Sequence, residues 1–172
     1  MPAPYHWLAF NLSYSNRLAL VAVGERLHVG VDVERVRFDL QTADLERYCL
    51  TRSEIDALPA DLPARRRAFF QCWTRKESYL KATGEGLACD LTSVAIERRS
   101  SATDVLRVVT AWRDRDWYVR DLQVVPGYKA AITLDDSRPV VLRTWPGRWW
   151  CVGGGAGASV CAPDPIGTRY LS

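Results

Sequence analysis

Residues 69–81, Phe-Phe-Gln-Cys-Trp-Thr-Arg-Lys-Glu-Ser-Tyr-Leu-Lys, decide the fold that we expect for this chain. Wound at roughly 100° per residue, they place an apolar stripe and its flanks on one side of a helix. The stripe and its flanks comprise Phe69, Phe70, Cys72, Trp73 and Leu80. The pattern predicts a helix over 64–82 that Gly84 is placed to end, and its aromatic side chains are best explained as core packing.

Charged residues interrupt the apolar side of this helix. Lys76 and Glu77 project within the apolar arc, and Lys81 lies at its edge, whereas an amphipathic helix normally carries its charges on the opposite side. Glu77 and Lys81, four residues apart, could also form a plain surface ion pair worth about 0.3–0.5 kcal/mol. Their place on the buried side favours a functional site.

A second unusual stretch, Val-Gly-Val-Asp-Val-Glu, occupies residues 29–34. Because strand side chains alternate between faces, Asp32 and Glu34 project to one side and Val31 and Val33 to the other. The simplest interpretation lets both acids face solvent over a valine-lined core. Two neighbouring carboxylates also repel each other, which a bound cation would relieve.

Together, the strand and the helix suggest a specific chemistry. Asp32, Glu34 and Glu77 would offer three hard oxygen ligands to an octahedral Mg²⁺, with room left for water and phosphate oxygens. Lys76 and Lys81 would add positive charge for a pyrophosphate. This combination suits displacement at phosphorus, where positioning and charge neutralisation supply most of the acceleration.

The remaining elements predict an α+β fold in which a mainly antiparallel sheet packs on the long helix. Gly24-Glu25 is expected to turn between the first two strands, and Pro59 and Pro63 to punctuate a loop. Residues 51–54 resemble a capping box that opens a short helix. The other expected elements are a helix at 40–49 and strands at 18–23, 27–34, 93–97, 105–112, 117–124 and 129–134.

Composition narrows the function class. The chain has 172 residues, a net charge of only +3 and 48% hydrophobic residues, which is ordinary for a globular protein. The basic run at 65–67 is expected to be a solvated helix face, and a nucleic-acid-binding module would rest on charge and tryptophan content alone. Five scattered cysteines without CxxC spacing fit reduced thiols in the cytoplasm, and we expect neither nucleic-acid nor membrane partners.

Residues 139–172 form a Gly/Pro-rich C-terminal extension, and we expect this segment to be poorly ordered. The alternative is a glycine-rich phosphate loop at 153–157. That stretch lacks the Lys-Ser/Thr ending of such a motif and a clear following helix, so the extension is the favoured interpretation.

Five motifs, in order, carry a family resemblance. They lie at residues 10–15, 30–34, 73–81, 84–87 and 126–131. Together they resemble the 4′-phosphopantetheinyl transferases, of the surfactin-synthetase-activating rather than the small trimeric type. The resemblance spans about residues 4–135. It implies a C-terminal transferase lobe at 29–138, preceded at 1–28 by a linking strand and a remnant of the first lobe.

The resemblance implies Mg²⁺-dependent transfer of phosphopantetheine from coenzyme A to a serine of an acyl or peptidyl carrier protein. The carrier serine would attack the β-phosphate and release 3′,5′-adenosine diphosphate. Mn²⁺ also accepts oxygen ligands and stays an alternative.

The resemblance also assigns roles to residues. Glu77, or a water held by Glu54, would accept the serine proton, which makes both candidates for catalysis together with Lys81. The expected metal ligands are Asp32, Glu34 and Glu77. The expected coenzyme A contacts are Ser13, Tyr14, Lys76 and Lys81.

Two departures from the family pattern bear on activity. The family usually has histidine where this chain has Tyr14, and a tyrosine hydroxyl carries no positive charge near neutral pH. Most of a first lobe is expected before Phe10 and is missing, so a homo-oligomer could replace it. An uncovered apolar face would then favour self-association. The competing hypothesis is a truncated remnant that binds coenzyme A, metal or a carrier protein without turnover.

Overall fold

The long helix is α3, Leu62–Thr83, in a computed structural model that describes residues 7–25, 28–84, 86, 89–98, 105–109, 115–136, 140–144 and 166–171. The Asp61 side chain caps its start by accepting a hydrogen bond from the N–H of Ala64 at 2.9 Å. Pro63 therefore lies in the first helical turn and not in the expected loop, since an N-terminal turn needs no N–H from proline. Gly84, with a φ of 74°, ends the helix as predicted.

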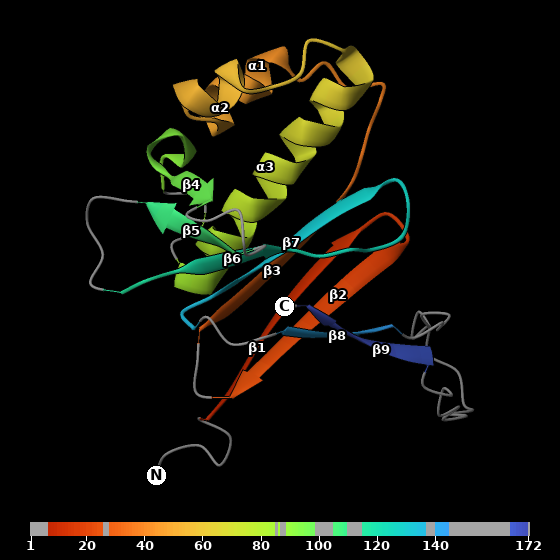
Figure 1. Cartoon of the computed structure of the whole chain (residues 1–172), viewed down its shortest axis with the longest axis vertical. Coiled ribbons are helices and arrows are strands. Elements are labelled where there is room, and N and C mark those ends of the chain that lie inside the picture. Colours follow the sequence, from red (N-terminus) through yellow and green to blue (C-terminus); the bar gives the residue numbers. More distant parts are fainter. Residues whose placement is uncertain are drawn as a thin grey trace, which may run out of the picture. The chain divides into compact units, whose positions relative to one another are not determined.

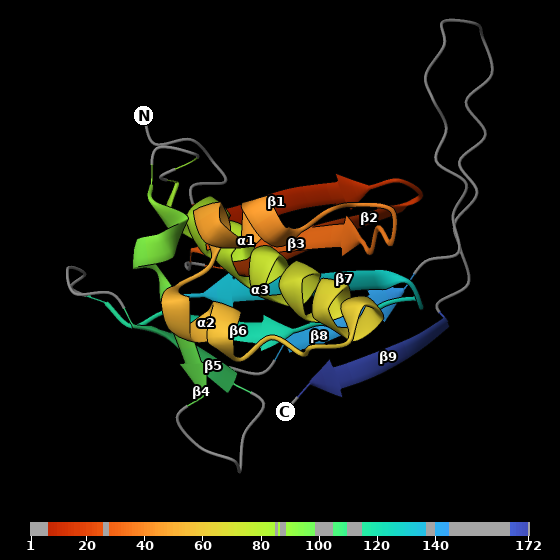
Figure 2. The ribbon, with the colours of Figure 1, turned by 90° about the horizontal axis from the view of Figure 1, so that it is seen from above.

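A five-stranded antiparallel sheet lies against α3 (Figures 1 and 2). Its strand order is β3-β7-β6-β5-β4, so β3 is an edge strand. The strands are β3 Val29–Arg35, β4 Ala95–Arg98, β5 Val105–Val109, β6 Tyr118–Asp121 and β7 Tyr128–Leu134. The predicted α+β fold, with a mainly antiparallel sheet packed on a long helix, is confirmed.

A separate hairpin precedes the sheet. Strands β1, Leu8–Ser15, and β2, Leu18–Glu25, pair antiparallel through a two-residue turn in which Asn16 has a φ of 53°. Asparagine tolerates this left-handed conformation better than most residues. The expected turn at Gly24-Glu25 is wrong, because both residues lie inside β2, and β2 pairs with β1 rather than with β3.

Two short helices lie near the start of α3 in the chain. They are α1, Ala43–Cys49, which begins three residues later than expected, and α2, Arg52–Asp56. Thr51 and Glu54 form the predicted capping box at the start of α2. The short 3₁₀ helix η2, Leu91–Ser93, displaces the start of the strand that was expected at 93.

The basic run at the start of α3 is not simply solvated. Arg65 binds Glu46 of α1, with Nη2 2.7 Å from Oε2, and the side chain of that glutamate is only 3% exposed. The Nε of Arg66 donates to the carbonyl of Leu40 at 3.0 Å. These side chains thus attach the α1 region to α3, which corrects the expectation of a solvated face.

Buried side chains pack α3 against the end of α1 and against the sheet. Phe69 and Phe70 are buried in a cluster with the end of α1, as predicted for core residues. Farther along α3, the hydroxyls of Ser78 and Thr133 lie 2.7 Å apart with both residues fully buried. A small polar pair at this point brings the helix close to β7 and to its neighbour β3.

Residues 138–172 form a second unit. In it, β8, Val140–Thr144, pairs antiparallel with β9, Ile166–Leu171, with an irregularity between Arg143 and Thr144. The glycine-rich stretch proposed as an alternative phosphate loop lies outside the described residues. Among the described residues, no helix is long and apolar enough to cross a membrane.

Candidate functional site

Gly30 sets the distance between β3 and α3. A Cβ atom built on this glycine would lie 2.0 Å from the carbonyl oxygen of Ser78 and 2.4 Å from the nitrogen of Ala82. Only a residue without a side chain fits between the strand and the helix backbone here. The acids of β3 are therefore held directly against the charged positions of α3.

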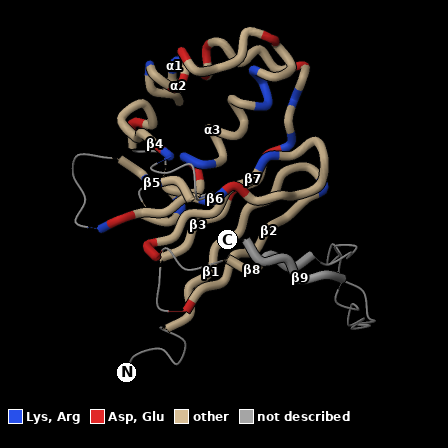
Figure 3. Tube along the Cα trace, viewed as in Figure 1, with Lys and Arg blue, Asp and Glu red and all other residues tan. Residues whose placement is uncertain are grey.

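Lys81 of α3 binds Asp32 of β3 across this contact. Its Nζ lies 2.7 Å from Oδ1 of Asp32 and 3.3 Å from the carbonyl oxygen of Val31. Figure 3 shows acidic and basic positions meeting where α3 passes the sheet. Asp32 is only 4% exposed, so the interpretation that it faces solvent is wrong.

Glu77, one helical turn before Lys81, joins the same site. Burial raises the pKa of Glu77, and the nearby Asp32 carboxylate raises it further, while Lys81 opposes the shift. Burial likewise raises the pKa of Asp32 against the lowering effect of Lys81. Among the described residues, Oε1 of Glu77 and Oδ2 of Asp32 are buried without a hydrogen-bond partner.

Glu34 is the third member of this carboxylate group, by which we mean the side chains of Asp32, Glu34 and Glu77. Burial is the main cause that raises its pKa, and Asp32 adds to it. Its Oε2 accepts a hydrogen bond from the Ser15 hydroxyl at 2.8 Å. The three predicted metal ligands thus influence one another electrostatically, although they come from a strand and a helix that are far apart in the sequence.

This donor set fits a hard divalent cation. Carboxylate oxygens are the ligands that Mg²⁺ and Mn²⁺ prefer, and a cation would satisfy the unpartnered oxygens of Asp32 and Glu77. In the described part of the chain, no three acid, histidine or cysteine side chains are already grouped as a metal site. A cation that contacts all three carboxylates would therefore require their side chains to rearrange.

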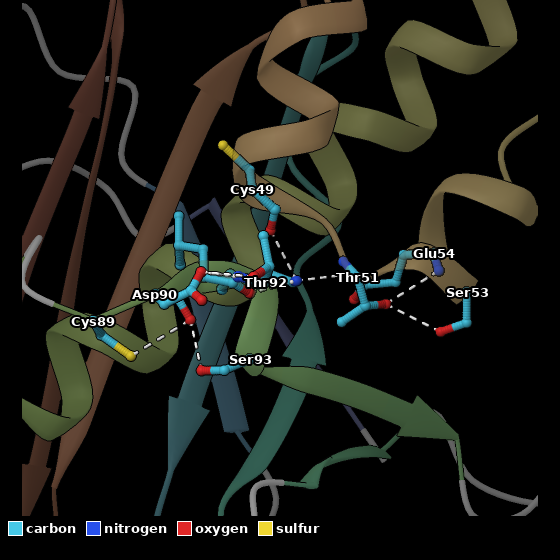
Figure 4. A network of polar contacts seen from close by, with 10 residues as sticks. Cys49, Thr51, Ser53, Glu54, Cys89, Asp90, Thr92 and Ser93 are labelled. Atoms are coloured by element: carbon cyan, nitrogen blue, oxygen red, sulfur yellow. Dashed lines mark hydrogen bonds and ion pairs between the residues drawn. The ribbon is translucent and has the colours of Figure 1, made fainter.

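Lys76 lies in a different, buried network. Its side chain is 1% exposed, and its Nζ lies 2.6 Å from Oε2 of Glu54, 2.8 Å from the carbonyl of Cys49 and 2.9 Å from that of Leu91. Figure 4 shows Cys49 and Glu54 approaching this network from α1 and α2, with Asp90 beside the turn of η2.

An ammonium group has three N–H donors, and each of the three donors of Lys76 has an acceptor. Glu54 is similarly engaged, because its carboxylate also accepts the N–H of Thr51 at 2.7 Å. These contacts suit structural roles for Lys76 and Glu54, and the predicted roles in coenzyme A binding and proton transfer stay predictions.

Ser13 and Tyr14, the other predicted coenzyme A contacts, lie on opposite faces of β1. Ser13 is buried, and its hydroxyl donates to Oδ1 of Asp32 at 2.9 Å. Tyr14 is 77% exposed on the other face. The structure therefore brings Ser13, but not Tyr14, to the carboxylate group.

Sequence reasoning missed Asn11 and Ser15, which also face β3. The signal was present, since residues 10–15 alternate strictly between large apolar and small polar side chains. That alternation is typical of a strand with one polar face, and it places Asn11, Ser13 and Ser15 on the same side.

Sequence similarity identifies the class of protein to which this chain belongs, a class of transferases. The chain belongs to the 4′-phosphopantetheinyl transferase superfamily, whose family model matches residues 28–133. It is 39% identical over 111 residues to the 4′-phosphopantetheinyl transferase HetI of Nostoc sp. (strain PCC 7120), a match that covers 61% of this chain and 44% of HetI.

Two other relatives show the same pattern. The 4′-phosphopantetheinyl transferase Sfp of Bacillus subtilis (strain 168) is 27% identical, over 72% of this chain and 53% of Sfp. The human L-aminoadipate-semialdehyde dehydrogenase-phosphopantetheinyl transferase is 24% identical, over 78% of this chain and 49% of its own length. The chain thus spans about half the length of the curated relatives that it matches.

Proposed function

We propose that this chain transfers the 4′-phosphopantetheine group of coenzyme A to a serine of an acyl or peptidyl carrier protein, with Mg²⁺, and releases 3′,5′-adenosine diphosphate. One observation carries the proposal: Asp32 and Glu77 each bury a carboxylate oxygen without a partner, beside the ammonium of Lys81. Membership in the superfamily gives this arrangement its reaction class.

Asp32, Glu34 and Glu77 are the residues that would hold the cation, with Mn²⁺ as an alternative to Mg²⁺. When bound, such a cation neutralises charge on pyrophosphate oxygens and orients them. Lys81, with a side chain 29% exposed, would turn from Asp32 to donate its N–H groups to a phosphate. The cation would thus replace Lys81 as the positive charge beside Asp32, and Lys81 would neutralise a phosphate instead.

In the reaction, the carrier serine oxygen forms a bond to the β-phosphorus of coenzyme A. The bond from that phosphorus to the oxygen bridging to 3′,5′-adenosine diphosphate breaks, and the nucleotide leaves with the electron pair. The serine proton needs an acceptor, and we assign Glu77 this role. Glu77 is our candidate because its carboxylate belongs to the site and keeps a buried oxygen without a hydrogen-bond partner.

The partners of the proposed reaction are coenzyme A, the carrier protein and a second copy of this chain, which would cover the exposed apolar side chains of β1 and β2. We place the reaction in the cytoplasm. The competing proposal is a remnant that binds coenzyme A, metal or carrier without turnover. An Asp32–Lys81 ion pair that persists in the presence of coenzyme A and Mg²⁺ would favour the remnant.

The test is the intact mass of an apo carrier protein after incubation with this chain, coenzyme A and Mg²⁺. A gain of one phosphopantetheine is expected, and EDTA and Glu77→Gln should abolish it. Glu97→Gln, at an exposed glutamate of β4, is the matched control and should leave the gain intact. If the folded chain binds coenzyme A without a mass gain, the transferase proposal fails and the remnant proposal stands.

A further inference from the structure

Strand β1 contacts the edge strand β3 through side chains rather than through a shared sheet. The two strands belong to different sheets. The N–H groups of Val31, Val33 and Arg35 donate to side-chain oxygens of β1 at 3.1, 3.2 and 3.0 Å. The acceptors are, in the same order, Oδ1 of Asn11, Oγ of Ser13 and Oγ of Ser15.

The spacing of these contacts is regular. Each pair differs by 20 in residue number, so β1 runs parallel to β3, and both advance by two residues between contacts. Edge-strand N–H groups normally pair with a neighbouring backbone or remain open to water. Here three side chains on the polar face of β1 accept from them, which fixes the register of β1 along β3.

Two of these side chains also hold the carboxylates. The Ser13 hydroxyl donates to Oδ1 of Asp32 at 2.9 Å, and the Ser15 hydroxyl donates to Oε2 of Glu34 at 2.8 Å. A hydroxyl has one donor hydrogen and two acceptor lone pairs. Each serine therefore accepts from the backbone of β3 and donates to a carboxylate of the same strand, so the orientation of that carboxylate is tied to its own strand.

We infer that Ser15 is a positioning residue for Glu34, and that Ser13 plays the same part for Asp32. Both hydroxyls pre-orient the two carboxylates of β3 for a divalent cation. The inference rests on the proposed function, since it assumes that these carboxylates bind the metal. Partners that orient metal ligands in this way typically contribute about 10–100-fold to metal affinity.

The test measures the melting temperature of the full chain against Mg²⁺ concentration, without coenzyme A or carrier. A ligand that binds the folded state stabilises it by RT ln(1 + c/Kd) at a Mg²⁺ concentration c, so the titration gives an apparent dissociation constant, in units of Mg²⁺ concentration. Ser15→Ala should raise that constant about 10-fold. Ser15→Thr keeps the hydroxyl and should restore it toward that of the unsubstituted chain.

A shape-matched pair and a distant control make the test specific. Ser15→Val has nearly the shape of Ser15→Thr but no donor, so it should behave like Ser15→Ala, and this pair decides the question if the alanine variant does not fold. Ser93→Ala removes a hydroxyl that donates to the carbonyl of Asp90 at 2.7 Å, outside the carboxylate group. It should leave the Mg²⁺ response unchanged.

The outcomes separate the inference from the proposed function. Ser15→Ala and Ser15→Val could melt lower in EDTA and yet keep the apparent Mg²⁺ dissociation constant of the unsubstituted chain. In that case the serine is merely structural, and the inference is overturned while the proposed function stands. If the unsubstituted chain shows no Mg²⁺ response, the inference falls together with the metal assignment. Transfer activity does not enter either result.

Discussion

The Nζ atom of Lys81 lies 2.7 Å from Oδ1 of Asp32, which joins the charged edge of α3 to a carboxylate of β3 that is almost fully buried. Gly30 lets the strand approach the helix backbone, and the Ser13 hydroxyl donates to the same carboxylate oxygen that binds Lys81. Asp32 is buried, has a lysine partner at Oδ1 and has no partner at Oδ2. Such a carboxylate is suited to exchange its lysine partner for a metal ion.

Replacing Lys81 by methionine should make the chain less stable and more responsive to Mg²⁺. At neutral pH the loss leaves Asp32 buried without its cationic partner, at a cost of about 1–3 kcal/mol. Added Mg²⁺ can supply the missing charge. The melting temperature, measured by circular dichroism, should therefore rise more from EDTA to Mg²⁺ in the variant than in the unsubstituted chain.

Arg47→Met is the control for this variant, because Arg47 pairs with Asp44 where both side chains are mostly exposed. Its melting temperature should change little under either condition. A Lys81→Met chain with an unaltered melting temperature in EDTA would show that the ion pair does not hold the site together.

Replacing Glu77 by glutamine should stabilise the metal-free chain at neutral pH. Burial raises the pKa of Glu77, so the folded chain keeps the proton at pH values where the unfolded chain has released it. The ionised carboxylate therefore costs stability above its folded pKa, and the cost is absent below the unfolded value of about 4.3. The gain of the variant should be present at pH 7.5 in EDTA and vanish toward pH 4.

The same variant should lose more than about 100-fold in transfer rate, because it lacks both a metal ligand and the proton acceptor. Glu97→Gln, at an exposed position, should alter neither property. A stability gain that is equally large at pH 7.5 and pH 4 would mean that burial of the charge is not its cause.

Much of the site could be predicted because periodicity assigns side chains to faces. Alternation along β3 places Asp32 and Glu34 together, and the helical stripe places Glu77 and Lys81 toward the core side. Periodicity could not show that Asp32 is buried rather than solvated. That outcome depends on how closely α3 approaches β3, which Gly30 and the Ser78–Thr133 contact determine.

The contacts of Lys76 and Glu54 were beyond sequence reasoning for a different reason. Helical geometry places Lys76 in the apolar arc beside Glu77, but its long side chain reaches away to α1, α2 and η2. Helical periodicity predicts the side of the helix from which a side chain projects, and it does not predict which residue the end of a long side chain contacts. The β1–β2 hairpin differs from the predicted pairing because the alternating residues 10–15 form a strand that pairs with β2.

Replacing Lys76 by methionine tests its structural role. The change leaves Glu54 without its partner and two buried carbonyls, those of Cys49 and Leu91, without a donor. Breaking such a buried pair typically costs about 3–5 kcal/mol, which urea unfolding would measure. The coenzyme A affinity of the folded variant should stay within about threefold of the original, roughly 0.6 kcal/mol.

A double variant, Lys76→Met with Glu54→Gln, should lose less stability than the sum of the two single losses, since they remove one interaction. The opposite pattern, with stability intact and coenzyme A binding much weaker, would return Lys76 to the predicted phosphate-binding role.

Replacing Gly30 by alanine should unfold the chain or destabilise it by more than about 3 kcal/mol, the upper end for overpacking. The added Cβ meets helix backbone at 2.0 and 2.4 Å, and backbone atoms cannot turn aside. Gly127→Ala is the matched control, because its φ of 86° imposes strain but nothing lies within 4 Å of the new atom. It should cost only about 1–2 kcal/mol. Equal losses in chemical denaturation would mean that the β3–α3 approach is not tight.

The hairpin presents an exposed apolar face that should drive self-association. Register places its side chains together, opposite the polar face toward β3. The face consists of Phe10, Leu12, Tyr14, Val21 and Val23, each at least 53% exposed. An apolar patch of this kind is unusual on a monomer. Light scattering at rising concentration should show dimers or larger species of this chain.

A charged substitution within the hairpin face, Val21→Lys, should shift this equilibrium toward the monomer by placing an ammonium opposite Leu12. Leu62→Gln is the control, since Leu62 is 61% exposed at the start of α3 and outside the hairpin face. It should leave the association unchanged. A chain that stays monomeric at every concentration tested would remove the second copy from the list of partners, and the proposed transfer would then have to proceed on a single chain.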